Sequence, residues 1–317
     1  MKKILAIVLA AVMLLSMTAC GAAAKKDTYV VGICQLVQHD ALDAATKGFQ
    51  DALTEALGDK VKFEVQNASG DSVNCGTIVN GFVSDGVDLI LANATPALQA
   101  AVAATDSIPI LGTAVTEYGV ALDIKDFNGT VGGNVSGTSD LAPLDQQAAM
   151  ILELFPDAKK VGILYCSAEP NSVYQADVVK AELEKSGVTV SVYTFADSND
   201  VAAVTATACD ENDVLYIPTD NTAASCTEAI NNVAEPAGVP IIAGEEGICA
   251  GCGVATLSIN YYDLGVTTGK MAAKILTGEA NISEMPIEYF PDPVKKYNPA
   301  ICEALGITIP EDYVAIG

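Results

Sequence analysis

Few residues in this chain have the type and spacing that catalysis requires. His39 is the one histidine in the sequence, so it has no second imidazole with which to share a metal ion. Cys249 and Cys252 form a single C-x-x-C without the second pair of a zinc finger, so the alternatives are a local disulfide or two free thiols. Glu245 and Glu246 are adjacent in a predicted loop, where neighbouring side chains usually point apart. We therefore expect no catalytic residue, no metal site and no cofactor.

Ligand binding is the chemistry that other positions suggest. Asp220 ends an apolar run and opens a helical pattern, so its carboxylate either caps that helix or holds a ligand ammonium. Thr95 has the corresponding place in the first half of the chain, where its hydroxyl and nearby N–H groups suit a ligand carboxylate. His39 lies in a polar turn and is either a ligand contact or an ordinary surface residue. We favour the ligand role for Asp220.

These positions are set by short apolar runs that alternate with helical patterns. The predicted strands are residues 28–36, 61–67, 87–93 and 108–113 in the first half, and 159–166, 188–195, 213–219 and 239–244 in the second. Runs that are apolar on both faces and joined by helices indicate a parallel sheet covered by helices on each side. The sequence therefore predicts an α/β protein with two doubly wound parallel-sheet lobes joined by a hinge.

The two lobes repeat one plan. Residues 88–95 match residues 213–220, and the Gly-, Asn- and Ser-rich residues 131–143 have the composition of a connection. We expect residues 29–140 and about 257–285 to form the N-terminal lobe. Residues 141–256 and about 286–317 would form the C-terminal lobe, which the tail closes with a helix and an extended end.

Ligands of open parallel sheets bind beyond the carboxyl ends of the strands, so the turns there are expected to face each other across a cleft. The candidate ligand-binding residues are Gln35, His39, Thr95, Thr113, Thr138 and Ser139 on one side and Ser167, Asn171, Ser172, Asp220, Asn221 and Glu245 on the other. The side chains that could line a pocket for an apolar or aromatic ligand side chain are Leu36, Val37, Tyr118, Tyr165 and Tyr174.

The charge balance limits the kinds of molecule that the chain is expected to bind. The chain has 16 Lys plus Arg, all of them lysine, against 40 Asp plus Glu, and its formal net charge is −24. So acidic a surface repels phosphate backbones, and we expect no nucleic-acid partner. The absence of arginine also removes the usual bidentate clamp for a carboxylate. A ligand carboxylate must then be held by backbone N–H groups, hydroxyls, amides or a lysine.

The N-terminus has the pattern of an export signal. Lys2 and Lys3 precede an uncharged apolar run, Ile4 to Leu15, which is too short to span a bilayer. The following "SMTAC" resembles the lipobox of bacterial lipoproteins, although Met17 stands where leucine is usual. We predict a signal peptide over residues 1–19, lipidation of Cys20 and a tether over residues 20–28. The alternative is a plain secretory signal cleaved near residue 19 or 24.

Beyond the N-terminus, the chain resembles a known family. The motifs that carry the resemblance are "VGICQLVQHDALDAATKGFQDAL", "ANATPALQAA", "GGNVSGTSDLAP", "LYCSAEPNSVYQ", "IPTDNTAAS" and "NYYDLGVTTGKMAAKIL". Together they are similar to the extracellular substrate-binding lipoproteins of ABC importers, in the branch associated with tryptophan, tyrosine and phenylalanine. The family implies a type I periplasmic-binding-protein fold that closes on a small molecule and delivers it to a membrane permease. The cysteine pair in "EEGICAGCGV" departs from the family pattern.

The resemblance implies a monomer, lipid-anchored to the outer face of a bacterial cytoplasmic membrane, that binds a small zwitterionic ligand. An aromatic amino acid is favoured. A nucleoside, a branched amino acid, a short peptide or a sugar is the alternative ligand. A secreted cleft enzyme is a less favoured alternative, because the chain has a single histidine and no metal cluster. A sensor-linked binding lobe is not separable from an importer receptor by sequence, since the partner would be another chain.

Overall fold

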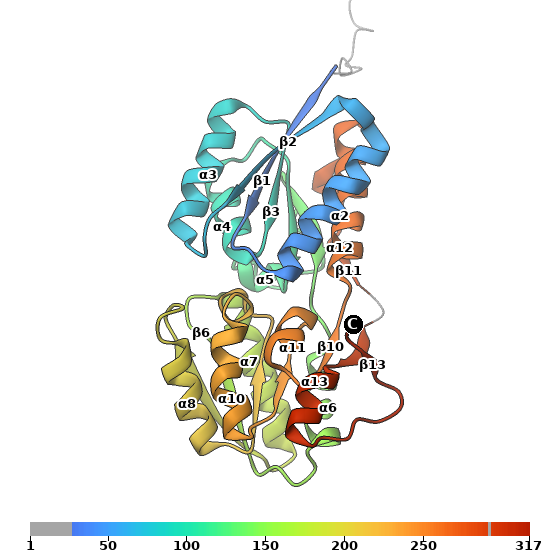
Figure 1. Ribbon diagram of the computed structural model, residues 1–317. Coiled ribbons are helices and arrows are strands. Elements are labelled where there is room, and N and C mark those ends of the chain that lie inside the picture. Colours follow the sequence, from blue (N-terminus) through green and yellow to red (C-terminus); the bar gives the residue numbers. More distant parts are fainter. Residues whose placement is uncertain (1–26, 291–292) are drawn as a thin grey trace, which may run out of the picture.

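A computed structural model of the chain describes residues 27–290 and 293–317. The predicted signal peptide, Cys20 and most of the predicted tether lie outside the described residues. Within the described ranges, no helix combines the length and the apolar content that a membrane span needs. The chain folds into two α/β lobes, one above the other in Figure 1. The predicted fold class is therefore confirmed.

The first lobe is built on a six-stranded parallel sheet with the order β11-β5-β4-β3-β1-β2. Its strands are β1 (Tyr29–Gln35), β2 (Val61–Asn67), β3 (Leu89–Asn93), β4 (Ile110–Val115), β5 (Val135–Ser139) and β11 (Glu288–Tyr289). Its helices are α2 (Asp40–Leu57), α3 (Ser72–Asp85), α4 (Thr95–Ala104), α5 (Tyr118–Ala121) and α12 (Tyr261–Leu276), with 3-10 turns at Gly58–Lys60 and Ile282–Glu284. Helices α2 and α12 cover one face, and α3 and α4 cover the other (Figure 1).

The second lobe has a seven-stranded sheet with the order β13-β12-β10-β9-β8-β6-β7, in which β12 runs antiparallel to β10. Its strands are β6 (Lys160–Cys166), β7 (Thr189–Phe195), β8 (Val214–Ile217), β9 (Ile241–Ala243), β10 (Ala255–Ser258), β12 (Val294–Tyr297) and β13 (Val314–Ala315). Its helices are α6 (Leu144–Leu154), α7 (Pro170–Lys185), α8 (Val201–Glu211), α9 (Asn221–Ala224), α10 (Thr227–Ala237), α11 (Glu246–Cys252) and α13 (Pro299–Leu305). The tail thus has the helix and extended end that the sequence predicts.

Each lobe has a separate core on either face of its sheet. Strand β3 is buried throughout, and its alternate residues face opposite layers: Leu89 and Leu91 pack toward α2 and α12, whereas Ile90 packs toward α3 and α4. In the second lobe Tyr216 and Leu215 divide in the same way between two buried clusters. This two-sided burial explains why the strand sequences are continuous apolar runs rather than alternating ones.

The internal repeat has a structural counterpart at the amino ends of the central strands. The Asp88 carboxylate accepts a hydrogen bond from Val30 N at 2.9 Å. The Asp213 carboxylate accepts one from Lys160 N, also at 2.9 Å. In each lobe an acidic residue before one central strand therefore fixes the start of its neighbour.

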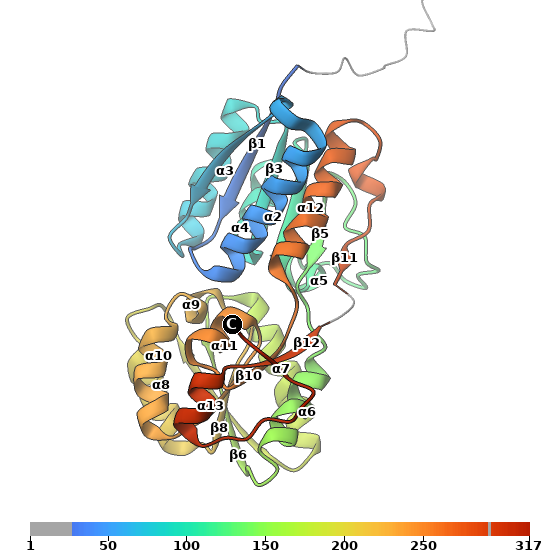
Figure 2. The same cartoon turned by 45° about the vertical axis from the view of Figure 1, so that its right-hand side comes forward.

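The chain passes between the lobes three times: after β5, through Ile259 and Asn260 after β10, and after β11 (Figure 2). The expected connection, residues 131–143, is mostly not a linker, because its middle is the buried strand β5. Gly137 in this strand serves packing, because a Cβ added there would lie 2.3 Å from the Tyr118 hydroxyl. The lobe boundaries also differ slightly from those expected, since β10 stays in the second sheet to Ser258 and β11 extends the first beyond residue 285.

Helix α12 returns to the first lobe and packs closely against α2. A Cβ added to Gly265 would lie 2.0 Å from the Ala45 carbonyl oxygen, and one added to Gly48 would lie 2.1 Å from the Tyr262 carbonyl oxygen. Because the two backbones nearly touch, only glycine fits at these positions. This contact fastens the second crossing to the first lobe (Figure 2).

All eight cysteines in the described part of the chain are free. Cys249 and Cys252 lie on α11, which is a helix where the sequence suggested a loop. Both are buried, and the Cys252 thiol donates to the Ile248 carbonyl oxygen at 3.4 Å. The structure thus has the pair as two free thiols that pack in the core, as small apolar side chains do.

Candidate functional site

A cavity of about 10 Å³ lies between the lobes, and residues of both lobes line it. The first lobe contributes His39, Leu42, Ala114 and Thr116; the crossings contribute Asp140 and Tyr261; and the second lobe contributes Asn171, Thr219, Asp220, Asn221, Ala224 and Glu245. This volume is close to that of one water-sized probe. A larger ligand therefore needs the lobes to lie somewhat further apart than they do in this structure.

The sequence predicted five of these lining residues, and the structure brings them together across the lobe interface. They are His39, Asn171, Asp220, Asn221 and Glu245. His39 Nε2 lies 3.3 Å from Asn221 Oδ1, a hydrogen bond from the first lobe to the second. Burial lowers the pKa of His39, so the imidazole is held in its neutral form. The turn after β1 and the turn after β8 are thus opposite walls of one cavity.

Asp220 has the N-cap position of α9, where its Oδ1 accepts from Ala223 N at 2.7 Å. Its Oδ2 accepts from Cys166 N at 2.8 Å and from the Ser172 hydroxyl at 2.7 Å. Burial first, and then the charge of Glu169, raises the pKa of Asp220 to about 8. Asp220 is therefore a helix cap and also part of the cavity wall, where a bound cation would favour its ionised form.

Glu245 has the same two roles at α11. Its carboxylate accepts from Gly247 N at 2.6 Å and from Ile248 N, so it caps the helix. Burial raises the pKa of Glu245 to about 7. Two capping carboxylates of the second lobe therefore face the cavity, and both are more easily protonated than an exposed acid.

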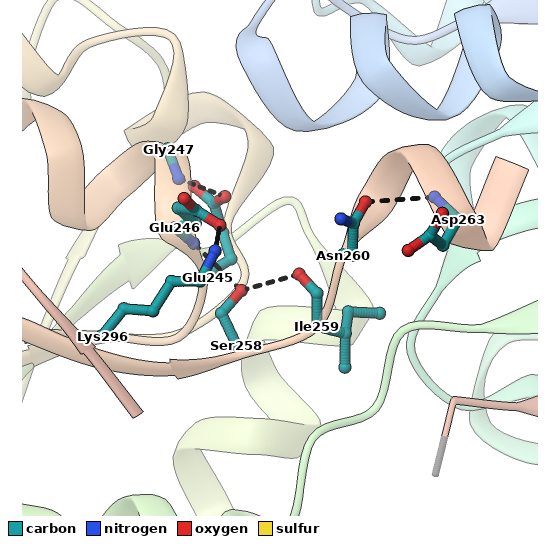
Figure 3. Close-up of polar contacts among 8 residues, drawn as sticks. All are labelled: Glu245, Glu246, Gly247, Ser258, Ile259, Asn260, Asp263 and Lys296. Atoms are coloured by element: carbon teal, nitrogen blue, oxygen red, sulfur yellow. Dashed lines mark hydrogen bonds and ion pairs between the residues drawn. The ribbon is translucent and has the colours of Figure 1, made fainter. Parts of the chain in front are cut away.

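Figure 3 shows how the second crossing is held beside Glu245. The Ser258 hydroxyl accepts from Glu246 N at 3.2 Å, and Glu246 pairs with Lys296 at 2.5 Å. Asn260 caps α12 by accepting from Asp263 N at 3.1 Å (Figure 3). The crossing is thus tied to α11 on one side and to α12 on the other.

Several predicted binding residues are placed away from the cavity, with their side chains engaged in structural contacts. Thr113 and Thr138 both contact the Thr268 hydroxyl, at 3.2 and 2.8 Å, and so link the sheet to α12. Thr113 is not at the cavity because β4 runs on to Val115, and Thr116 takes the place expected for it.

The other predicted binding residues outside the cavity also make contacts within their own lobe. Gln35 accepts from the Thr46 hydroxyl at 2.7 Å and donates to Asp43 at 2.6 Å, so it stays within the first lobe. Ser139 donates to the Thr116 carbonyl oxygen at 2.7 Å, and Ser167 donates to the Phe195 carbonyl oxygen at 3.3 Å. Two more, Thr95 at the start of α4 and Ser172 behind Asp220, are buried outside the cavity lining.

The expected aromatic wall is also placed differently. Tyr118 is fully buried and donates to the Thr138 carbonyl oxygen at 3.1 Å, while Tyr165 and Tyr174 pack in the second lobe's core. Leu36 and Val37 line a separate interlobe groove of about 180 Å³, which shares Asn221 with the cavity. The tyrosine that does line the cavity is Tyr261.

Sequence reasoning missed Asp140 and Tyr261, which the structure joins. The Tyr261 hydroxyl donates to Asp140 Oδ2 at 2.9 Å, and both side chains are buried. Asp140 directly follows β5 at the first crossing, and Tyr261 begins α12 after the second. The signal that could have found them is their position, because residues at lobe crossings form the floor of an interlobe cleft.

The cavity is acidic. Asp140, Asp220 and Glu245 all line it, and no lysine does among the described residues. Burial raises the pKa of all three carboxyl groups, because an ionised carboxylate loses its hydration there. The arrangement therefore suits a ligand that brings its own positive charge.

A family model described as ABC transporter substrate binding protein matches residues 30–316. The chain is a member of this family of substrate-binding proteins. A tyrosine-binding protein of Clostridioides difficile is 38% identical over 260 residues, which cover 81% of this chain and 75% of the relative. A Streptococcus pneumoniae ABC domain solved in complex with L-Trp is 35% identical, with a TM-score of 0.85 and coverage of 90% and 96% of the two chains.

A third comparison informs the arrangement of the lobes in this substrate-binding protein. The ligand-free, open structure of a Clostridium difficile substrate-binding protein with adhesive properties is 37% identical and covers 91% of this chain and 99% of its own. Its TM-score is 0.69, lower than that of the L-Trp complex at nearly the same identity. The lobes of this substrate-binding protein are therefore arranged more as in the L-Trp complex than as in the open protein.

Proposed function

We propose that this substrate-binding protein is the extracellular receptor of an ABC importer and closes around a zwitterionic aromatic amino acid. The observation that carries the proposal is the interlobe cavity, which Asp140, Asp220 and Glu245 line without a lysine. A buried carboxylate without a counter-ion is costly, and a ligand ammonium would provide that counter-ion. The receptor itself would perform no chemistry and would act as a monomer.

The ligand carboxylate has candidate donors in the same cavity. The Gln175 amide donates to the hydroxyl oxygens of Thr116, at 3.4 Å, and of Thr219. The Thr219 hydroxyl oxygen accepts from this amide, which leaves its hydroxyl proton for a ligand carboxylate. Both threonines line the cavity, one from each lobe. Such neutral donors fit a chain that has no arginine.

Two relatives favour an aromatic side chain on the ligand, because one is named a tyrosine-binding protein and the other was solved in complex with L-Trp. The groove that adjoins the cavity at Asn221 supports this proposal. It is lined on the first lobe by Leu36, Val37 and Pro96, which offer apolar surface beside the polar cavity. An amino acid could therefore keep its charged groups inside and direct its ring along this groove.

Calorimetric titration of the purified chain tests the proposal. L-Trp, L-Tyr and L-Phe are compared with L-Leu, with a nucleoside and with two tryptophan analogues that lack either the ammonium or the carboxylate. We expect micromolar or tighter binding of at least one aromatic amino acid and at least a 30-fold weaker affinity for each analogue. Binding of the nucleoside alone, or turnover of any compound, would contradict the proposal.

Export and anchoring complete the proposed role. Residues 1–19 would be removed as a signal peptide, and a lipid on Cys20 would hold the receptor at the outer face of the cytoplasmic membrane beside its permease. Cys20→Ser should then release the protein into the medium, as fractionation and immunoblotting would show. Retention of this variant in the membrane would speak against the lipid anchor.

A further inference from the structure

Three buried acceptor atoms around the cavity have no hydrogen-bond partner among the described residues. They are His39 Nδ1, Asp140 Oδ1 and Asn171 Oδ1. Buried polar atoms in proteins are nearly always paired, so three unpaired ones on a single cavity require an explanation. Elsewhere in the described chain, such atoms do not gather on one cavity in this way.

The hydrogen-bond network settles that all three are acceptors. His39 Nε2 faces Asn221 Oδ1, and that oxygen is fixed because Asn221 Nδ2 donates to Glu169 at 2.6 Å. Nε2 must therefore carry the proton of the neutral ring, which leaves a lone pair on Nδ1. Asn171 Nδ2 donates to the Thr219 carbonyl oxygen at 2.9 Å, so the other amide atom of Asn171 is the oxygen.

We propose that His39 Nδ1, Asp140 Oδ1 and Asn171 Oδ1 together form the seat of the ligand ammonium. The proposal rests on the proposed function, since it assigns the site of one group of that ligand. A primary ammonium carries three N–H donors and no acceptor, so its donors match the three atoms in number and kind. A hydroxyl or a neutral amide offers fewer donors and would leave part of the set unpaired.

The seat takes one residue from each lobe and one from a crossing between the lobes. His39 precedes α2 in the first lobe, Asn171 lies in the first turn of α7 in the second, and Asp140 stands at the first crossing. A ligand ammonium in this seat is bound fully only when the lobes are closed, because the two lobes supply different atoms. Occupancy of the seat therefore favours the closed arrangement over the open one.

Tyr261 positions the seat through Asp140. Its hydroxyl donates to Asp140 Oδ2 at 2.9 Å, which leaves Oδ1 as the oxygen for the ligand. Tyr261 begins α12 at the second crossing, so this bond ties two of the three crossings together. Asp140 thus belongs to the first crossing and is held in place by a residue of the second.

The chain offers a matched control for Tyr261. Tyr262 is the next residue, and its hydroxyl also donates to an aspartate, Asp51 Oδ2, at 2.9 Å. Tyr262 is 37% exposed and its bond stays within the first lobe, away from the cavity lining. Tyr262→Phe therefore removes the same hydroxyl and the same kind of bond without touching the seat.

The experiment compares L-Trp with the analogue that lacks only the ammonium, 3-(indol-3-yl)propanoate, by calorimetry. We expect Asp140→Asn to weaken L-Trp about 30-fold or more and the analogue less than about threefold. Tyr261→Phe should weaken L-Trp about fivefold, and Tyr262→Phe less than twofold. The double variant Asp140→Asn/Tyr261→Phe should lose little beyond Asp140→Asn alone, since Tyr261 acts through Asp140.

The outcomes separate this inference from the proposed function. If the unaltered chain binds no amino acid, the proposed function fails first. If the unaltered chain binds L-Trp but Asp140→Asn weakens both ligands equally, Asp140 is structural and the seat is overturned. If Asp140→Asn does not fold, Tyr261→Phe decides: equal weakening of L-Trp and the analogue overturns the seat, and selective weakening of L-Trp supports it.

Discussion

The two lobes share a plan at the amino ends of their strands and differ at the carboxyl ends. Asp88 and Asp213 both accept backbone N–H groups at the start of a neighbouring strand. At the other end, Thr95 follows β3 where Asp220 follows β8. The acids that position the strands are therefore the same in both lobes, whereas the residues that follow the two strands differ.

The difference gives the lobes unlike electrostatic roles. In the first lobe the last residue of β3, Asn93, is neutral and donates to the Leu42 carbonyl oxygen at 2.9 Å. In the second lobe Asp220 and Glu245 are carboxylates at helix N-termini and face the cavity. The second lobe thus brings most of the negative charge to the ligand, and the first lobe closes over it with neutral groups.

The larger effect on ligand affinity should come from Asp220, which we compare with Asp213 at the other end of β8. Asparagine caps helices as well as aspartate does, so Asp220→Asn removes the charge and keeps the α9 cap. Asp220 lines the same cavity as the ammonium seat but contributes no atom to it, so its charge would act on the ligand ammonium without a direct hydrogen bond. Affinity for the amino-acid ligand should therefore fall about 30-fold, or about 2 kcal/mol, the lower end of the cost of removing one buried charge of a pair. Calorimetric titration and thermal melting of the same variant measure both effects.

Asp213→Asn is the matched control at the opposite end of the same strand. Its carboxylate accepts from Lys159 N and Lys160 N at 2.8 and 2.9 Å, far from the cavity lining. We expect this variant to lose up to about 1 kcal/mol of stability and no affinity. The opposite pattern, near-parental affinity for Asp220→Asn, would reduce Asp220 to a helix cap.

The repeat made this comparison predictable from sequence, but it did not reveal the floor of the cavity. Asp220 could be found because its strand matches that of Thr95. Asp140 and Tyr261 belong to no repeated motif, and they meet only because two crossings run side by side. Sequence patterns report local periodicity, whereas this contact depends on the path of the chain between lobes.

Two other differences have local physical causes. Thr113 was expected at the cleft, but β4 continues through Ala114, at a φ of 51°, and moves the strand end to Val115. The small residues of 131–143 suggested a linker, but Gly137 is small because the Gly112 backbone and the Tyr118 hydroxyl lie against it. Close packing and flexibility both require small side chains, so composition alone does not distinguish the two.

A second prediction concerns the contact that only the first lobe has, between α2 and α12. Gly265→Ala places a methyl group 2.0 Å from the Ala45 carbonyl oxygen, so the helices must move apart. Overpacking of this kind costs about 1 to 3 kcal/mol, which thermal or urea unfolding would measure. Gly76→Ala is the control, because that helical glycine has no atom within 4 Å of an added Cβ.

The control should change stability in the opposite direction. Alanine stabilises an open helical position by about 0.5 to 1 kcal/mol relative to glycine. Equal effects of Gly265→Ala and Gly76→Ala would mean that α12 is not held closely against α2.

The last prediction concerns the pH dependence of stability, to which Asp213 and Asp220 should contribute with opposite signs. Two backbone N–H groups lower the pKa of Asp213, so its stabilising contribution is present at neutral pH and is lost as the pH falls through that lowered value. Burial raises the pKa of Asp220 to about 8 and of Glu245 to about 7. Their contribution is fully present below about pH 4 and is lost as the pH rises through 7 to 8.

Without ligand, the melting temperature should therefore fall between pH 6 and pH 8.5. A bound ammonium favours the ionised carboxylates, so ligand affinity should rise over the same interval, by at most about tenfold per pH unit for each group. Binding at pH 7 should release protons, which calorimetry in buffers of different ionisation enthalpy measures directly. Asp220→Asn should reduce this release, and Asp213→Asn should leave it unchanged. Proton uptake on binding, or equal release in both variants, would show that Asp220 does not respond to the ligand charge.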